Sequence, residues 1–110
     1  MKTITLISKG ELKKKIDHQE DIQIVNVLSP EYYHLGFIKG SFKIPLAELE
    51  NRFDELDKSK EVVVYCASRD CQASKRAAEL LEQMGFRVSA YEGGIKEWKK
   101  SRFSREENGS

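Results

Sequence analysis

The 110-residue sequence is poor in several of the residues that define specialised protein classes. It contains two cysteines, two prolines and one tryptophan, and two cysteines are too few for the disulfide framework of a small secreted domain. No internal repeat, low-complexity segment or linker rich in Pro, Gly and Ser divides the chain. Its length therefore predicts one domain, which we assign to residues 1–103, followed by a flexible polar tail at 104–110.

The sequence also lacks a charge excess of either sign and a long hydrophobic run. Nineteen Lys and Arg residues balance 18 Asp and Glu residues, so nothing indicates nucleic acid or an anionic membrane as a partner. The N-terminal segment MKTITLISKGELKKK has only a few apolar residues before charges resume, whereas a secretory signal needs about 7–15 and a membrane helix about 20. We therefore expect a cytoplasmic protein, in which a cysteine pair is more often reactive or metal-binding than structural.

Apolar periodicity predicts strands that alternate with helices, an α/β arrangement. At the start of the chain, Ser8 and Glu11 fit a capping box that begins a helix. Such alternation is typical of a parallel sheet covered on both faces, in which ligands bind beyond the carboxyl ends of the strands. The expected strands are 3–7, 22–28, 42–44, 61–65 and 88–91, and the expected helices are 8–16, 29–36, 46–53, 74–84 and 95–100.

One cysteine is expected at that edge of the sheet. In the segment EVVVYCASRDCQASKRAAELL, residues 61–81, an apolar strand ends at Cys66 and a short polar loop leads into a helix. A thiol attacks as the thiolate, and its unperturbed pKa is about 8.5. The helix N-terminus, the loop amides and the cations Arg69, Lys75 and Arg76 all favour the anion. This order of elements favours a nucleophilic Cys66 over a buried cysteine that only completes the strand.

Three segments together resemble the rhodanese-like domain, from Ser8 to about Lys100. They are VVVYC at 62–66 with AAELL at 77–81 and MGF at 84–86, EGGIKEW at 92–98, and SPEYYHLGFIKGSFKIPLAEL at 29–49. The resemblance implies a three-layer sandwich whose five-stranded, mainly parallel sheet has helices on both faces. It also implies a sulfurtransferase that needs no metal or organic cofactor. Cys66 would take the outer sulfur of thiosulfate, polysulfide or a persulfide and pass it to a thiol or protein acceptor.

The implied substrate site is the loop that follows Cys66. The loop residues that would surround the sulfur-containing anion are Ala67, Ser68, Arg69, Asp70 and Gln72. Cys71 is the second catalytic candidate, since two thiols five residues apart in a curled loop can come within disulfide distance. Cys71 could resolve the Cys66 persulfide and leave a disulfide, carry sulfur itself, or pack under the sheet edge. The sequence leaves these three roles open.

The sequence departs from the family pattern in several places. Many members have Asp-Val-Arg where this chain has Asn26-Val27-Leu28, and Phe37 stands where a His is usual. The active-site loop is longer than the common sulfurtransferase loop and lacks its frequent Gly and Arg. A buried ion pair can be exchanged for uncharged residues without loss of stability when both partners change together. We therefore expect a divergent member with an unchanged fold.

Three competing functions are weighed against the sulfurtransferase. A non-catalytic rhodanese-like binding or regulatory module would tolerate the lost polar residues, although the retained Cys66 argues against it. A Cys-dependent phosphatase or arsenate reductase needs an Arg at position 72, and Gln72 offers no bidentate guanidinium. A zinc site would have to combine Cys66 and Cys71 with His18 and His34, neither of which is near them in sequence. The donor, the acceptor and the oligomeric state are not determined.

Overall fold

The computed structural model describes residues 4–68 and 71–100. The predicted tail at 104–110 and the loop residues Arg69 and Asp70 lie outside this part of the chain. Within it, five strands form one sheet in the order β1-β5-β4-β2-β3, and all of their pairings are parallel. The strands are β1 (Thr5–Ile7), β2 (Ile22–Asn26), β3 (Phe42–Lys43), β4 (Glu61–Tyr65) and β5 (Val88–Tyr91). The predicted α/β fold is confirmed.

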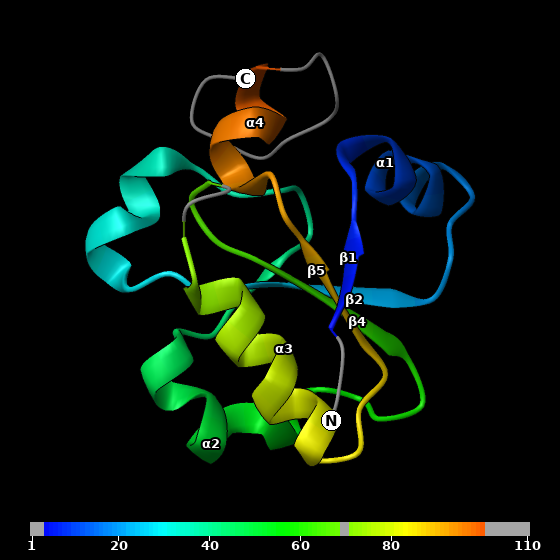
Figure 1. The fold of residues 1–110 in the computed structure, drawn as a ribbon, viewed down its shortest axis with the longest axis vertical. Helices are drawn as coiled ribbons and strands as arrows, with labels where there is room; N and C mark the ends of the chain where they lie inside the picture. The colour runs from blue at the N-terminus through cyan, green and yellow to red at the C-terminus, as the bar shows by residue number, and fades with distance from the viewer. Residues whose placement is uncertain (1–3, 69–70, 101–110) are drawn as a thin grey trace.

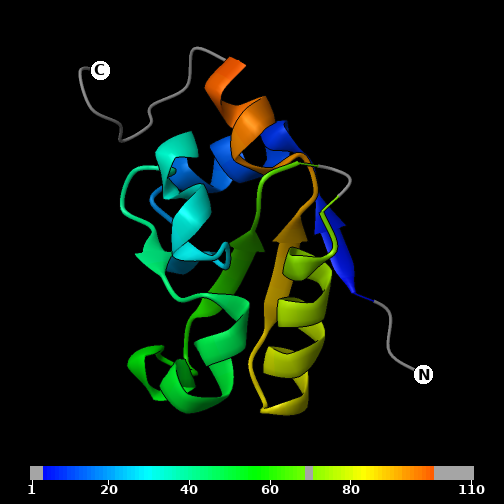
Figure 2. The same ribbon diagram turned by 90° about the vertical axis from the view of Figure 1, so that its left-hand side faces the viewer.

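Helices lie on both sides of this sheet. In Figures 1 and 2, α2 and α3 lie together against one face, and α1 and α4 lie together on the other side. None of the helices in residues 4–68 and 71–100 is both long enough and apolar enough to cross a bilayer. The α-helices are α1 (Lys9–Asp17), α2 (Leu49–Arg52), α3 (Ala73–Gln83) and α4 (Gly94–Lys100), and the 3₁₀ helices are η1 (Pro30–Leu35), η2 (Leu46–Glu48) and η3 (Phe53–Glu55).

Local sequence signals account for several element ends. Ser8 Oγ accepts a hydrogen bond from the Glu11 N–H at 3.2 Å, and Glu11 Oε1 accepts one from the Ser8 N–H at 2.8 Å, so the predicted capping box is formed. Helix α3 ends as expected before Gly85, which has a φ of +96°. The helix predicted over 46–53 is present, but it is divided into three consecutive short helices, η2, α2 and η3. The backbone departs from ideal α-helical angles at Glu48 (φ −103°, ψ −3°) and at Arg52 (φ −124°, ψ 7°).

The core is centred on β4, whose three valines, Val62 to Val64, are fully buried because both faces of the sheet are covered. The next residue, Tyr65, is also buried, and its hydroxyl accepts a hydrogen bond from the Ile38 N–H at 3.0 Å and lies 2.9 Å from Ser41 Oγ. Burial raises the pKa of the Tyr65 hydroxyl. These contacts fix the segment before β3 against the carboxyl end of β4.

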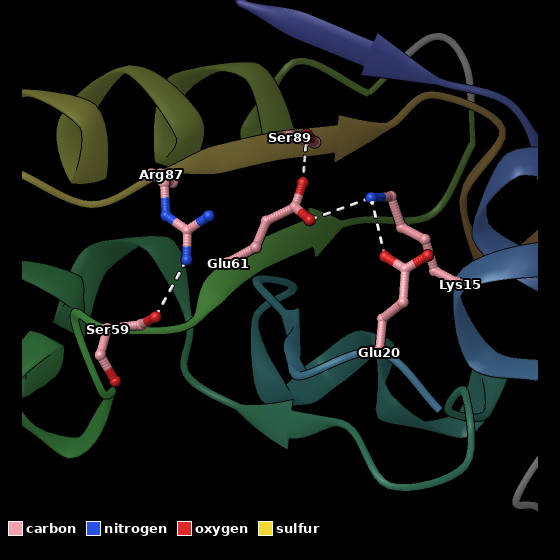
Figure 3. A network of polar contacts seen from close by, with 6 residues as sticks. All are labelled: Lys15, Glu20, Ser59, Glu61, Arg87 and Ser89. Carbon is pink, nitrogen blue, oxygen red and sulfur yellow. Dashed lines mark hydrogen bonds and ion pairs between the residues drawn. The ribbon is translucent and has the colours of Figure 1, made fainter. Parts of the chain in front are cut away.

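Charged side chains meet at the amino ends of β4 and β5. Figure 3 shows Lys15 of α1 reaching Glu61, the first residue of β4, with its Nζ 3.0 Å from Glu61 Oε1. Lys15 Nζ also lies 3.4 Å from Glu20 Oε1, and Ser89 Oγ donates to Glu61 Oε2 at 2.9 Å. The hydrogen bond to Glu61 raises the pKa of Lys15, against the opposing effect of burial. We call Lys15, Glu20, Glu61 and Ser89 the amino-end network.

Candidate active site

The backbone after β4 is held by the start of α4. The carbonyl oxygens of Cys66 and Ala67 accept hydrogen bonds from the N–H groups of Ile95 and Lys96, both at 2.9 Å. Within the loop, the Cys71 N–H donates to the Ser68 carbonyl at 3.0 Å. The loop is therefore positioned by main-chain hydrogen bonds, which do not depend on the identity of its side chains.

Gly94 permits the close approach between α4 and this loop. Its φ is +72°, and a Cβ at this position would lie 2.6 Å from both the Ala67 carbonyl carbon and the Ser68 nitrogen. Trp98 fixes the same helix from within the core, since it is 1% exposed and packs edge-on against the Tyr91 ring at 5.8 Å. The EGGIKEW segment thus places the N-terminus of α4 under the cysteine loop.

The two cysteines of the chain form a disulfide in this structure. Cys66 and Cys71 have Cα atoms 6.4 Å apart, within the range that a disulfide spans, so the prediction that the loop can bring the two thiols together is confirmed. Cys66 is only 1% exposed and belongs to the core, and its Sγ lies 3.6 Å from the Cys71 carbonyl oxygen. The expectation of a reachable Cys66 sulfur is therefore not met in this oxidised state. Cys71 is the partly exposed member of the pair.

A cleft of about 550 Å³ opens beside the disulfide. Its walls come from segments 27–29, 46–47 and 67–68, together with Tyr32, Cys71 and Ala73. It lies where β2 and β4 end, the edge at which the sequence predicts a ligand site. Among the described lining residues there is no charged side chain, so the walls next to Cys71 are mainly apolar.

The structure brings some of the predicted site residues together at this cleft. Ala67, Ser68 and Cys71 line it, whereas Gln72 is exposed, precedes α3 as its N-cap and does not line it. Lys75 and Arg76, which we expected to favour the Cys66 anion, are also absent from the lining. Arg69 and Asp70 lie outside the described residues. In residues 4–68 and 71–100, no backbone N–H donates a hydrogen bond to Cys66 Sγ, so the amide cradle stays a prediction.

The departures from the family pattern have visible consequences. Asn26 is fully buried, and its Oδ1 accepts a hydrogen bond from the Leu28 N–H at 2.8 Å, which turns the chain at the end of β2. Leu28 then lines the cleft with an apolar side chain. Phe37 packs edge-on against Tyr33 at 5.3 Å and lies under Lys43 Nζ at 4.3 Å. Leu28 therefore places an apolar side chain in the cleft wall where the family pattern has an Arg.

Sequence reasoning missed most of the cleft wall. The cleft is lined in part by Val27, Tyr32, Leu46 and Ala47. The sequence predicts only a strand or a helix at these positions, because nothing in the local pattern indicates that the segments meet. The resemblance of segment 29–49 to the family was the one signal that could have indicated them. In the described part of the chain, no group of three or more His, Cys, Asp or Glu residues could hold a metal ion.

Comparison with known proteins identifies relatives over most of the chain. Residues 8–101 match the rhodanese-like domain family. The chain is 30% identical over 92 residues to a putative sulfurtransferase of Bacillus subtilis, YtwF, and this match covers 84% of the chain and 87% of that protein. It is 31% identical over 93 residues to a Mycobacterium tuberculosis protein named HTH-type transcriptional regulator Rv0324, and this match covers 84% of the chain.

Some of these relatives are much longer. The chain spans 41% of the length of the regulator and 51% of a putative sulfur carrier protein of Bacillus subtilis, YrkF, to which it is 33% identical over 97 residues, 87% of its own length. Among solved structures, a rhodanese-related protein of Thermoplasma volcanium superposes with a TM-score of 0.78 at 28% identity, over 91% of this chain and 95% of that one.

Proposed function

This chain belongs to the rhodanese-like domain family, and on that premise we propose that it is a sulfurtransferase that carries sulfur as a persulfide on Cys66. The observation that supports this most is the pair Cys66 and Cys71, which lies beside a cleft at the carboxyl end of β4. Relatives named as sulfurtransferases agree with this reaction class. The donor would be a small sulfur-containing anion, and the acceptor a thiol or a protein.

In the first step, reduced Cys66 attacks as the thiolate. A bond forms between Cys66 Sγ and the outer sulfur of the donor, and the sulfur–sulfur bond of the donor breaks. The electron pair leaves with the rest of the donor, which is sulfite from thiosulfate or a thiolate from a persulfide. The first-turn amides of α3 would support the anion, since the Gln72 side chain makes no cap hydrogen bond and so does not compete for them. The amides of residues 67–72 would form the rest of the cradle.

The second step can follow either of two routes. An acceptor thiolate can attack the outer sulfur, form its own persulfide and return Cys66 as the thiolate. Alternatively, the Cys71 thiolate attacks Cys66 Sγ, hydrosulfide leaves, and the Cys66–Cys71 disulfide of this structure remains. Two external thiols then restore the dithiol and are oxidised to their own disulfide. This cycle requires free thiols, as a cytoplasmic location would provide.

Intact-mass spectrometry tests the assignment. The Cys71→Ser variant, which cannot form the internal disulfide, should gain one sulfur atom when the reduced protein is exposed to thiosulfate, polysulfide or an organic persulfide. The Cys66→Ala variant should gain none, and wild type should instead show loss of two hydrogens as its disulfide forms. If Cys71→Ser gains no sulfur from any of these donors, the protein is not a sulfurtransferase of this kind.

A non-catalytic binding module is the second candidate. It is favoured by the burial of Cys66 and by the uncharged residues Asn26 and Leu28. The two functions differ in the reactivity of the reduced thiol with iodoacetamide. A catalytic Cys66 should be alkylated well below its ordinary pKa of about 8.5, whereas Cys66 in a binding module should resist alkylation at every pH at which the chain is folded.

A further inference from the structure

The two sulfurs of the disulfide differ in access. Cys66 is 1% exposed and packed in the core, whereas Cys71 is partly exposed and lines the cleft. The rate at which a thiol opens a disulfide depends on which sulfur it can reach. A thiol that enters from the cleft meets Cys71 first, and Cys66 is then the leaving group.

The cleft favours one chemical class of thiol. Leu28, Leu46 and Ala47 contribute apolar walls, and its volume of about 550 Å³ lies within the range of about 300–1,000 Å³ for sites that hold small organic molecules. An alkyl stem gains free energy when these walls remove it from water.

We propose that this cleft is a thiol site, which binds an organic thiol by its apolar stem and directs its sulfur to Cys71. The thiolate attacks Cys71 Sγ, a mixed disulfide forms on Cys71, and the electron pair of the broken bond leaves on Cys66. A second molecule of the thiol, attacking as its thiolate, cleaves the mixed disulfide and releases Cys71 as thiolate and the small molecule as its own disulfide. The place of this step in the catalytic cycle rests on the proposed function. Cys66 is regenerated first, ready for the next donor.

The rate of disulfide opening tests this site without any sulfur donor. The oxidised full chain is mixed with ethanethiol, propanethiol or butanethiol, and each rate is divided by the rate at which the same thiol reduces a small-molecule disulfide. We expect the normalised rate to rise about three- to fourfold for each added methylene. The proposal is wrong if the normalised rate does not change with the length of the alkyl chain. It is also wrong if the oxidised protein contains no Cys66–Cys71 disulfide.

A pair of tryptophan variants locates the effect. Ala47 is exposed and lines the cleft, so Ala47→Trp should fill it and abolish the dependence on chain length. Gln83 is exposed at the far end of α3, and Gln83→Trp adds the same side chain outside the cleft. This control should keep the wild-type dependence. If Ala47→Trp also keeps it, the thiol does not bind in the cleft and the proposal is wrong.

Rapid quenching identifies the sulfur that is attacked. When the reaction is stopped early with a maleimide, peptide mass spectrometry should find the alkylthio group on Cys71 and the maleimide on Cys66, and the reverse assignment would overturn the proposal. The thiol experiments and the persulfide experiments can fail independently of each other. If thiol selectivity holds and no donor loads Cys66, the sulfurtransferase assignment fails alone. If Cys66 loads and the thiol series is flat, only the thiol site fails.

Discussion

The amino-end network and the cysteine loop, at opposite ends of the sheet, are held by different kinds of contact. At the amino end, side chains interact with side chains: Lys15 and Ser89 both bind the carboxylate of Glu61 (Figure 3). At the carboxyl end, the loop is held by main-chain hydrogen bonds, from the Ile95 and Lys96 N–H groups to carbonyl oxygens. Apolar side chains and a disulfide lie beside these bonds.

This difference explains how the loop can diverge while the fold is kept. Every non-proline residue has the same backbone donor and acceptor, so substitutions in the loop leave its attachment to α4 in place. Side chains such as Ser68 and Cys71 are then free to set the chemistry of the cleft. In the amino-end network, by contrast, each contact depends on one particular side chain, and a single substitution removes it.

Gly94→Ala should have the largest effect, because it breaks the backbone attachment at the carboxyl end. The added Cβ would overlap main-chain atoms of Ala67 and Ser68, in a conformation with φ of +72°. We expect the free energy of unfolding to fall by about 3 kcal/mol, measured by urea denaturation. Gly40→Ala is the matched control. Gly40 has a φ of +81°, and among the described residues beyond its two chain neighbours no atom lies within 4 Å of the position that its Cβ would take. This variant should cost about 1 kcal/mol. If both variants lose the same free energy of unfolding, the close approach of α4 to the cysteine loop is not the reason that Gly94 is needed.

Asn26→Leu tests the turn that leads β2 into the cleft. It removes the acceptor of the buried Leu28 N–H, and an unsatisfied buried donor should lower the free energy of unfolding by about 2 kcal/mol. Asn26→Asp keeps the acceptor but adds a buried charge, so it should also lower the free energy of unfolding at pH 7. This decrease should become smaller as the pH falls and the carboxyl is protonated. If Asn26→Leu is as stable as wild type in urea, this hydrogen bond does not hold the turn.

Glu61→Gln tests the amino-end network with a smaller expected loss, about 1 kcal/mol at pH 7. Because the pKa of Lys15 is raised in the folded protein, the stabilisation should be complete below the unfolded pKa and disappear as the pH rises through the folded value. Urea denaturation between neutral and alkaline pH measures this trend. Asp17→Asn, which removes the more exposed pair with Lys13, should cost less. A larger loss for Asp17→Asn would contradict this ranking.

Ser59→Ala should produce the smallest change, a shift in the pKa of one carboxyl group, that of Asp57, which precedes β4. The Ser59 hydroxyl and N–H both donate to Asp57 Oδ1, at 2.6 and 2.9 Å, and lower the pKa of Asp57. Without the hydroxyl, that pKa should rise toward its ordinary value, as measured by NMR titration. Any stability linked to this lowered pKa is present above the unfolded pKa and lost as the pH falls through the folded value. The pKa of Glu55, lowered by Arg52, should not move.

Patterns within short segments predicted most of the fold. The valines of β4, the Ser8–Glu11 capping box and the apolar face of α3 each have a local signature. The division of segment 46–53 was not predictable, because the apolar spacing of Leu46, Leu49 and Phe53 also fits one continuous helix. For the site, the sequence indicated both cysteines and their possible bond, yet it assigned the reachable sulfur to Cys66.

The sequence alone determined the element order, the parallel sheet and the position of a cysteine at its carboxyl edge, since strand and helix periodicity, caps and β-branched runs act over a few residues. Only the tertiary structure decided that Cys71 faces the cleft while Cys66 is buried, and that Leu28, Leu46 and Ala47 form its walls. Those features depend on how segments far apart in the chain pack against each other. Which of the two cysteines is buried depends on the assembled molecule, and the local pattern around them does not encode it.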